Sequence, residues 1–277
     1  MYGAIIGDIV GSVYEWNRIK TKDFPLFSPK SDFTDDSVMT VAIASAILRS
    51  RREGIPFRET AAQEMQAFGR RYPNRGYGGR FRHWLNSNHP KPYGSYGNGS
   101  AMRVSPCGLI ARSLDEAISL ASKSAEATHN CPEGIKGAVA VAAAVYLAKT
   151  GADKAEIREY IQKEYYPLDR TLDEIRPGYH FDETCQGSVP EALTAFLESD
   201  SYEDAIRGAV SLGGDSDTQA AIAGSVAWAH YGKNGLTPEM EELRKRVEAL
   251  LPDEFLDVIR EFENAVKESD AIVTDFG

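Results

Sequence analysis

The sequence contains few cysteines, and their distribution argues against two kinds of structural element. Only three occur among 277 residues, at Cys107, Cys131 and Cys185, and no two of them form a CxxC pair. An odd, widely spaced set favours neither a disulfide framework nor a structural zinc site. We therefore expect free thiols, which are typical of a protein in the reducing cytoplasm.

Long hydrophobic runs are also missing. The longest apolar stretches, 38–48 and 137–148, are much shorter than the roughly 20 residues of a membrane-spanning helix. The first residues, MYGAIIGDIVGS, carry no basic leader, and Asp8 interrupts their short apolar run, so they do not resemble a signal peptide. The sequence predicts a cytoplasmic protein that does not bind membranes.

An excess of basic residues is absent as well. The chain has 31 Lys and Arg against 41 Asp and Glu, which gives a formal net charge of −10. General nucleic-acid binding needs a basic face toward the phosphates, so this composition argues against it. The hydrophobic share of 42% and the charged share of 26% are those of a globular rather than a disordered protein.

What the chain does contain is a succession of helical patterns. Apolar residues recur at three- and four-residue spacing, and no stretch alternates for long enough to predict a sheet. We predict helices over 38–52, 56–68, 114–128, 132–149, 154–164, 189–197, 202–211, 218–231, 237–250 and 252–266. No repeat or low-complexity linker divides the chain. The prediction is a single compact all-α domain over residues 1–277, expected to be a monomer because no feature marks an interface.

Residues 73–98 depart from this pattern, because they are dense in Gly, Pro, Asn, Tyr and Arg. A structureless loop of this length in a compact domain usually carries function. Near its end, residues 94–103 read GSYGNGSAMR. Closely spaced glycines allow backbone N–H groups to cradle an anion, Ser95 adds a hydroxyl donor, and Tyr96 can stack on a base. The alternative interpretation of residues 94–103 is a tight turn that leads into a helix. Residues 76–79, GYGG, are a second flexible segment from which the chain can contact a ligand.

Two acidic helix starts carry the strongest chemical signal. TDDS at 34–37 precedes one apolar helix, and GGDSDT at 213–218 opens another. Helix capping alone explains either motif, because Asp, Ser and Thr satisfy free N–H groups at helix starts. One cap needs one side chain, however, whereas each motif offers two carboxylates and a hydroxyl. Both helices are too apolar to lie at the surface, so we expect their starts to converge inside the fold.

Converging carboxylates repel one another unless protons or cations neutralise them. Hard oxygen donors suit Mg²⁺, Mn²⁺ or Ca²⁺ rather than zinc or copper, and the number of acids favours two ions. Three further residues stand near these motifs or near the glycine cradle. Glu15, taken singly, is more typical of a solvated surface acid. His129, taken singly, is more typical of a cation at a helix end or of a hydrogen-bonded core histidine. Asp8, in its apolar surroundings, is expected to accept hydrogen bonds from nearby backbone.

The TDDS, GNGSAMR and GGDSDT segments, in this order and after the GD of residues 7–8, resemble the ADP-ribosylglycohydrolase family over nearly the whole chain. The resemblance implies an all-α fold with two Mg²⁺ ions, or Mn²⁺ in some members, at the floor of an ADP-ribose cleft. The implied metal ligands are Thr34, Asp35, Asp36, Asp215, Asp217 and Thr218. The implied substrate contacts are Gly78, Gly94, Ser95, Tyr96, Gly97, Asn98, Gly99 and His129, with Tyr96 near the adenine.

Residues 7–15, GDIVGSVYE, are similar to the branch of this family that acts on serine-linked ADP-ribose and poly(ADP-ribose). In that branch the matching glutamate acts in catalysis, which implies a catalytic role for Glu15. The implied metal-site residues Asp35 and Asp36 are the other implied catalytic residues. The implied substrate is an ADP-ribosylated protein or a related conjugate, and arginine-linked substrate stays open. The expected reaction is hydrolysis of the glycosidic bond through an oxocarbenium-like transition state.

Two other functions are compatible with the same residues. A two-metal nucleotide phosphohydrolase needs the same carboxylates and would release AMP or phosphate rather than intact ADP-ribose. A non-catalytic ADP-ribose binder is the second alternative, because the family includes members recruited to structural roles. The presence of all the implied metal ligands together with Glu15 favours the hydrolase.

Overall fold

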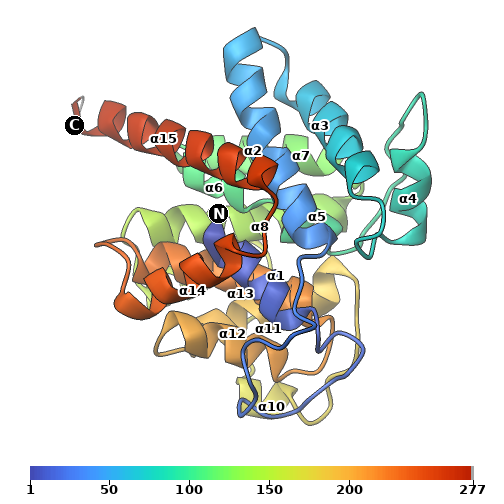
Figure 1. The fold of residues 1–277 in the computed structure, drawn as a ribbon. Coiled ribbons are helices and arrows are strands. Elements are labelled where there is room, and N and C mark those ends of the chain that lie inside the picture. The colour runs from blue at the N-terminus through green and yellow to red at the C-terminus, as the bar shows by residue number, and fades with distance from the viewer. Residues whose placement is uncertain (276–277) are drawn as a thin grey trace.

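The computed structural model describes residues 1–275, with 272–275 as backbone only (Figure 1). Within this range the chain forms fifteen helices and no strand, and Gly97 and Thr184 make an isolated β-bridge. The helices are α1 (Tyr2–Gly11), α2 (Asp35–Glu53), α3 (Phe57–Arg71), α4 (Gly79–Leu85), α5 (Gly99–Met102), α6 (Ser105–Ile110), α7 (Leu114–Glu126), α8 (Pro132–Lys149), α9 (Lys154–Glu164), α10 (Leu172–Ile175), α11 (Cys185–Leu197), α12 (Tyr202–Val210), α13 (Ser216–Tyr231), α14 (Pro238–Glu248) and α15 (Asp253–Asp275). The predicted all-α class is confirmed.

Helices α1 and α13 lie side by side at the centre of the fold (Figure 1). Every residue of α1 is buried. Glycines spaced four residues apart allow its backbone to contact α13: a Cβ on Gly3 would lie 2.3 Å from the carbonyl oxygen of Gly224, and one on Gly11 would lie 2.4 Å from Cα of Asp217. The sequence did not predict α1, because glycine is a poor helix former and a uniformly apolar segment shows no helical period.

Gly7→Ala is expected to destabilise the protein. The added Cβ would lie 2.1 Å from the carbonyl oxygen of Ala220, a backbone atom that can move only if α13 moves. Overpacking a core costs about 1–3 kcal/mol, occasionally more, and urea unfolding measures the loss. Gly178→Ala is the matched control, since no heavy atom lies within 4 Å of the Cβ added there. Equal stability of the two variants would contradict the close approach of α1 and α13.

Several predicted boundaries shift in the structure. Helix α2 begins at Asp35 rather than at residue 38, so the acids form its first turn. Helix α11 begins at Cys185 rather than at 189, with Pro190 inside it. Residues 73–98 are not wholly structureless, because they contain α4, whose Trp84 and Leu85 are buried. The Gln66 side chain donates from Nε2 to the carbonyls of Trp84 at 3.0 Å and Leu85 at 3.3 Å, which ties α4 to α3.

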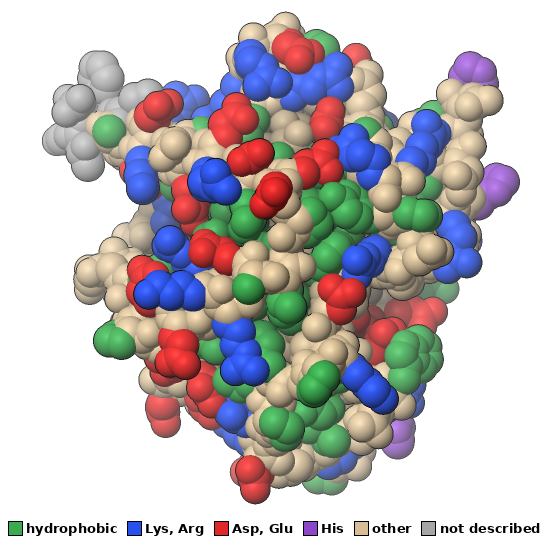
Figure 2. Space-filling model, viewed as in Figure 1, with side chains coloured by type: hydrophobic (Ala, Val, Ile, Leu, Met, Phe, Trp, Pro, Cys, Tyr) green, Lys and Arg blue, Asp and Glu red, His purple; other side chains and the backbone are tan. Residues whose placement is uncertain are grey.

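The surface is mixed in charge. On the face shown in Figure 2, Lys and Arg side chains are interspersed with Asp and Glu, without a continuous basic band. Among the described residues, no helix combines the length and the apolar character needed to cross a membrane.

Candidate active site

The starts of α2 and α13 converge beside α1, as the sequence predicts. Single carboxylate oxygens of Asp8, Asp36 and Asp217 lie within 4.8 Å of one another, and so do those of Glu15, Asp215 and Asp217. Asp217 belongs to both groups and joins them. The two helix starts also contact each other directly, since Thr218 Oγ1 donates to Asp36 Oδ2 at 3.2 Å.

Asp8 fixes α1 to the start of α2. Its carboxylate accepts hydrogen bonds from the N–H of Thr34 at 2.9 Å, from Thr34 Oγ1 at 2.7 Å and from the N–H of Ser37 at 3.0 Å, and the Ser37 hydroxyl donates to it as well. Thr34 Oγ1 in turn accepts the N–H of Asp36 at 3.3 Å as the N-cap of α2. The structural role expected for Asp8 is therefore present. Its place among the clustered acids was not predicted.

Burial raises the pKa of the clustered acids, and their mutual charges add to the rise. Burial, followed by the charge of Asp217, raises the pKa of Asp36 well above its usual value, and burial followed by Asp215 does the same for Asp217. Burial raises the pKa of Asp215 to about 6, although hydrogen bonds from Asp217 and Asn98 oppose the rise. Burial also raises the pKa of Glu15 to about 7, with Asp217 adding to the effect. The cluster thus favours either protons or a bound cation.

An unpaired atom shows that a cation fits this cluster. Asp36 Oδ1 is buried and has no hydrogen-bond partner in the described structure. A buried carboxylate oxygen without a partner is unfavourable, and a divalent cation bound by several carboxylates removes that cost. All the donors here are oxygens, which is the ligand set that Mg²⁺ and Mn²⁺ prefer. The residues present therefore fit the implied metal chemistry.

Asp35 borders the acidic cluster, because burial and then the charges of Asp217 and Asp8 raise its pKa well above its usual value. Its N–H donates to the carbonyl of Arg75 at 2.7 Å. Its Oδ1 is 3.0 Å from the position that a Cβ on Gly76 would take, so one carboxylate oxygen lies beside the 75–77 loop. The structure brings Asp36, Asp215, Asp217 and Thr218 together but leaves Asp35 at the edge of the cluster. Its implied role as a metal ligand stays a prediction.

The glycine cradle, residues 94–99, is linked to the acids through one side chain. Asn98 Nδ2 donates to Asp215 Oδ2 at 2.8 Å. Several cradle amides already have partners in the protein: the N–H of Gly94 donates to Asn130 Oδ1 at 2.8 Å, and that of Asn98 donates to the carbonyl of Glu183 at 2.7 Å. Anion binding by these amides stays a prediction. The side chain of Tyr96 is 53% exposed and its ring is available for stacking.

Two thiols donate hydrogen bonds to backbone carbonyls of the cradle, a role that the sequence did not predict. Cys131 Sγ donates to the carbonyl of Ser95 at 3.0 Å, and Cys185 Sγ donates to that of Gly97 at 3.1 Å. The two cysteines are far apart in the sequence, so no local signal connects them with the cradle. Gly78 lies elsewhere, exposed at the start of α4 on the approach loop.

His129 lies beneath the cradle. It is buried, and its Cε1 is 3.6 Å from the position that a Cβ on Gly99 would take. Burial, and after it the charge of Arg103, lowers the pKa of His129 well below its usual value, so the ring is neutral. Its Nδ1 is 2.6 Å from Thr128 Oγ1, a hydroxyl that also accepts from the buried Arg103 at 3.0 Å. The residue is therefore a neutral part of the core and not a helix-end cation.

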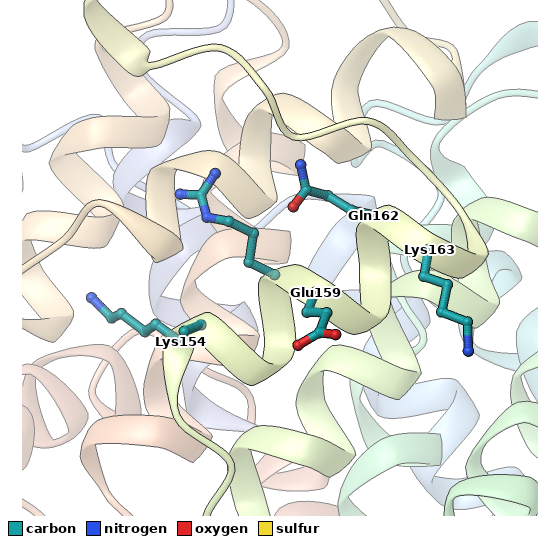
Figure 3. Close-up of a pocket in the computed structure, with 6 residues that line it drawn as sticks. Lys154, Glu159, Gln162 and Lys163 are labelled. Carbon is teal, nitrogen blue, oxygen red and sulfur yellow. The ribbon is translucent and has the colours of Figure 1, made fainter.

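Surface hollows elsewhere lack such chemistry. The hollow in Figure 3 is lined by residues of α9 alone, among them Lys154, Glu159 and Lys163. A second, of about 860 Å³, lies between α2, α7 and α15 and pairs arginines with glutamates. Neither of these two hollows contains a residue of the acidic helix starts. The grouped carboxylates make the acidic cluster the candidate active site.

Comparisons with known proteins agree with this assignment. A family model described as ADP-ribosylglycohydrolase matches residues 1–269. ADP-ribosylhydrolase ARH3 of Mus musculus is 26% identical, over 83% of this chain and 82% of its own. ADP-ribosylarginine hydrolase Tri1 of Pseudomonas putida is 33% identical, over 53% of this chain and 41% of its own.

A solved structure shares the fold. The "ADP-ribosylglycohydrolase-related protein complex" superimposes with a TM-score of 0.67 at 24% identity, covering 93% of this chain and 94% of that chain. The family model itself spans almost the whole sequence and includes the converging acids and the cradle. The chain therefore belongs to the ADP-ribosylglycohydrolase family of hydrolytic enzymes.

Proposed function

We propose that this protein is a divalent-cation-dependent hydrolase that cleaves the glycosidic bond between ADP-ribose and a modified protein side chain. The observation that carries the proposal is the pair of overlapping carboxylate groups joined by Asp217. The exposed ring of Tyr96 lies on the segment that is hydrogen-bonded to this cluster through Asn98 and Asp215. The site thus offers an aromatic surface for a base and a polar centre for a sugar.

The acids have different parts in the proposed reaction. Mg²⁺ or Mn²⁺ held by Asp36, Asp215 and Asp217 would supply charge neutralisation and orient the hydroxyls of the ribose. Glu15 is only partly buried, and its carboxylate lies beside Asp215 and Asp217, within reach of water and of the scissile bond. We assign to Glu15 the proton transfer with water or with the leaving group.

The leaving group is the finer part of the proposal. The similarity of residues 7–15 to the branch that acts on serine-linked ADP-ribose and poly(ADP-ribose) favours those substrates, and the ARH3 relatives are ADP-ribosylhydrolases by name. The Tri1 relatives act on ADP-ribosylarginine according to their name, and one of them is 33% identical over about half of this chain. We place serine-linked substrate first and arginine-linked substrate second. The cytoplasmic location and the monomeric state stay predictions from the sequence.

A product assay on ADP-ribosylated peptides tests this function. We expect intact ADP-ribose to be released from a serine-linked peptide in the presence of Mg²⁺, and release to stop when EDTA is added. Mass spectrometry of the product separates the alternatives. AMP or phosphate would favour a nucleotide phosphohydrolase, and tight binding without turnover would favour a binding protein. Undiminished turnover in EDTA would contradict the role of the cation.

A further inference from the structure

An exposed aromatic pair, Trp16 stacked on Phe181, adjoins the acidic cluster, and we call this pair the aromatic shelf. Trp16 directly follows Glu15 in the chain, and its side chain is 76% exposed, the highest value among the exposed large hydrophobic residues of the described structure. Its ring stacks on that of Phe181 with centroids 5.8 Å apart and an interplanar angle of 24°. The guanidinium of Arg18 lies 4.8 Å from the centroid of the Phe181 ring. The Trp16 side chain also hydrogen-bonds to that of Glu15. Most of the indole surface stays in water, and this apolar surface gains free energy only when a partner covers it.

The segment that bears this shelf is anchored on both sides. Lys20 Nζ donates to the carbonyls of Arg176 at 2.8 Å, Tyr179 at 2.5 Å and Leu212 at 2.6 Å. A Cβ on Gly213 would lie 2.8 Å from the carbonyl oxygen of Ile19, which shows how closely this segment packs against the approach to α13. These contacts hold residues 16–20 against residues 176–181, so the backbone that bears Trp16 is fixed in place.

Trp16 adjoins the acid that the proposed function places at the scissile bond. Glu15, the neighbour of Trp16, is grouped with Asp215 and Asp217, where the proposed function places the ribose and the scissile bond. Tyr96 lies in the cradle, where that function places the base. Because the proposed function gives Glu15 the proton transfer at the scissile bond, the leaving group lies beside Glu15 and next to Trp16.

We propose that Trp16, supported by Phe181, contacts the polypeptide on the leaving-group side of the scissile bond and makes the enzyme prefer ADP-ribose attached to a peptide over ADP-ribose attached to a single amino acid. The inference rests on the proposed function. A polypeptide is the favoured partner because the leaving group of the proposed reaction is a protein side chain, and the chain that carries it lies on the side of Glu15 and its neighbour Trp16. Trp and Arg are also the residues that contribute most to binding at protein interfaces.

The test compares two substrates that share one scissile bond. ADP-ribosylserine within a peptide and ADP-ribosylserine as the free amino acid are hydrolysed by the wild type, Trp16→Ala and Trp16→Phe. We expect the peptide-to-amino-acid ratio of kcat/KM to fall about tenfold in Trp16→Ala, chiefly through the KM for the peptide, and to recover in Trp16→Phe. Leu250→Ala, which truncates a large hydrophobic residue that is 40% exposed on another surface, is the matched control and is expected to keep the wild-type ratio. Arginine-linked pairs replace the serine-linked pairs if the wild type acts only on arginine.

Each other outcome has a definite meaning. An equal loss on both substrates would overturn the inference, because Trp16 would then position Glu15 and not contact the peptide. An unchanged ratio would overturn it as well, and so would a preference for ADP-ribosylated nucleic acid that Trp16→Ala removes. If the wild type hydrolyses no substrate, the proposed function fails, and the inference is then decided by calorimetry with ADP-ribosylated peptide and free ADP-ribose. Trp16→Ala must weaken binding of the peptide more than binding of ADP-ribose, or the inference is wrong.

Discussion

Asp217→Asn is expected to reduce kcat by at least about a hundredfold and to remove the stabilisation that divalent cations give to the protein. Asp217 is the carboxylate common to both acidic groups, so its replacement affects every cation position that the cluster can form. Substitution of residues that merely support metal ligands costs about 10- to 100-fold in affinity or activity, and a shared ligand should cost more. Turnover and the Mg²⁺-dependent shift in Tm measure the two effects.

The same substitution is expected to make the cation-free protein more stable near pH 8. Burial, and after it the charge of Asp215, raises the pKa of Asp217 well above its usual value, so an ionised Asp217 is unfavourable in the folded state and a neutral amide relieves it. Each kcal/mol of repulsion removed raises Tm by roughly 2–4 °C in a domain of this size. Asp169→Asn, at an exposed acid, is the matched control and should change neither quantity. A cation-free Asp217→Asn protein that melts below the wild type would contradict the repulsion between the clustered acids.

The second large effect is a stability that depends on pH and on the cation together. The pKa values of the clustered acids are higher in the folded protein than in the unfolded chain, for example about 6 for Asp215 and about 7 for Glu15. The folded state therefore binds more protons, and the stability that these protons provide is present below about pH 4 and is lost as the pH rises through the folded values. Without divalent cation, we expect Tm to fall between about pH 5 and about pH 8.

Added Mg²⁺ should oppose this loss, because the ion and the protons compete for the same carboxylates. We expect a small Mg²⁺-induced rise in Tm near pH 5 and a much larger one near pH 8. Thermal melts of the wild type and Asp217→Asn, each with Mg²⁺ and with EDTA, separate this effect from titration elsewhere in the chain. A rise in Tm that is the same at both pH values would contradict the linkage between protonation and cation binding.

The sequence predicted the parts of the site that depend on local rules. Thr34 caps α2 and two acids fill the first turn of that helix, as the TDDS motif indicates. The convergence of the two motifs followed from the apolar character of both helices. The direction in which each acid points could not be predicted in this way. Asp35 borders both the cluster and the 75–77 loop, whose Arg75 carbonyl accepts its N–H, and this loop is distant from the acids in the sequence.

Long-range contacts explain the rest of what sequence analysis missed. The partners of the cradle amides, Asn130 and Glu183, lie many residues away from the cradle, and no pattern within it identifies them. Helix α1 was missed because its glycines make it a weak helix by local propensity, although burial against α13 favours it strongly in the fold. These features depend on tertiary packing, which outweighs local preference in a buried segment.

The glycine-lined contact between α1 and α13 also bears on how this enzyme can change during evolution. Asp8 and Asp217 stand on two helices whose backbones touch, with Gly11 packed against Cα of Asp217. The spacing of these two acids is therefore set by the main chain and not by the loops that bear Trp16 and Tyr96. Substitutions in those loops can alter which conjugates are accepted while the distance between the helices stays the same. The reaction centre and the recognition of the acceptor can accordingly diverge independently of each other.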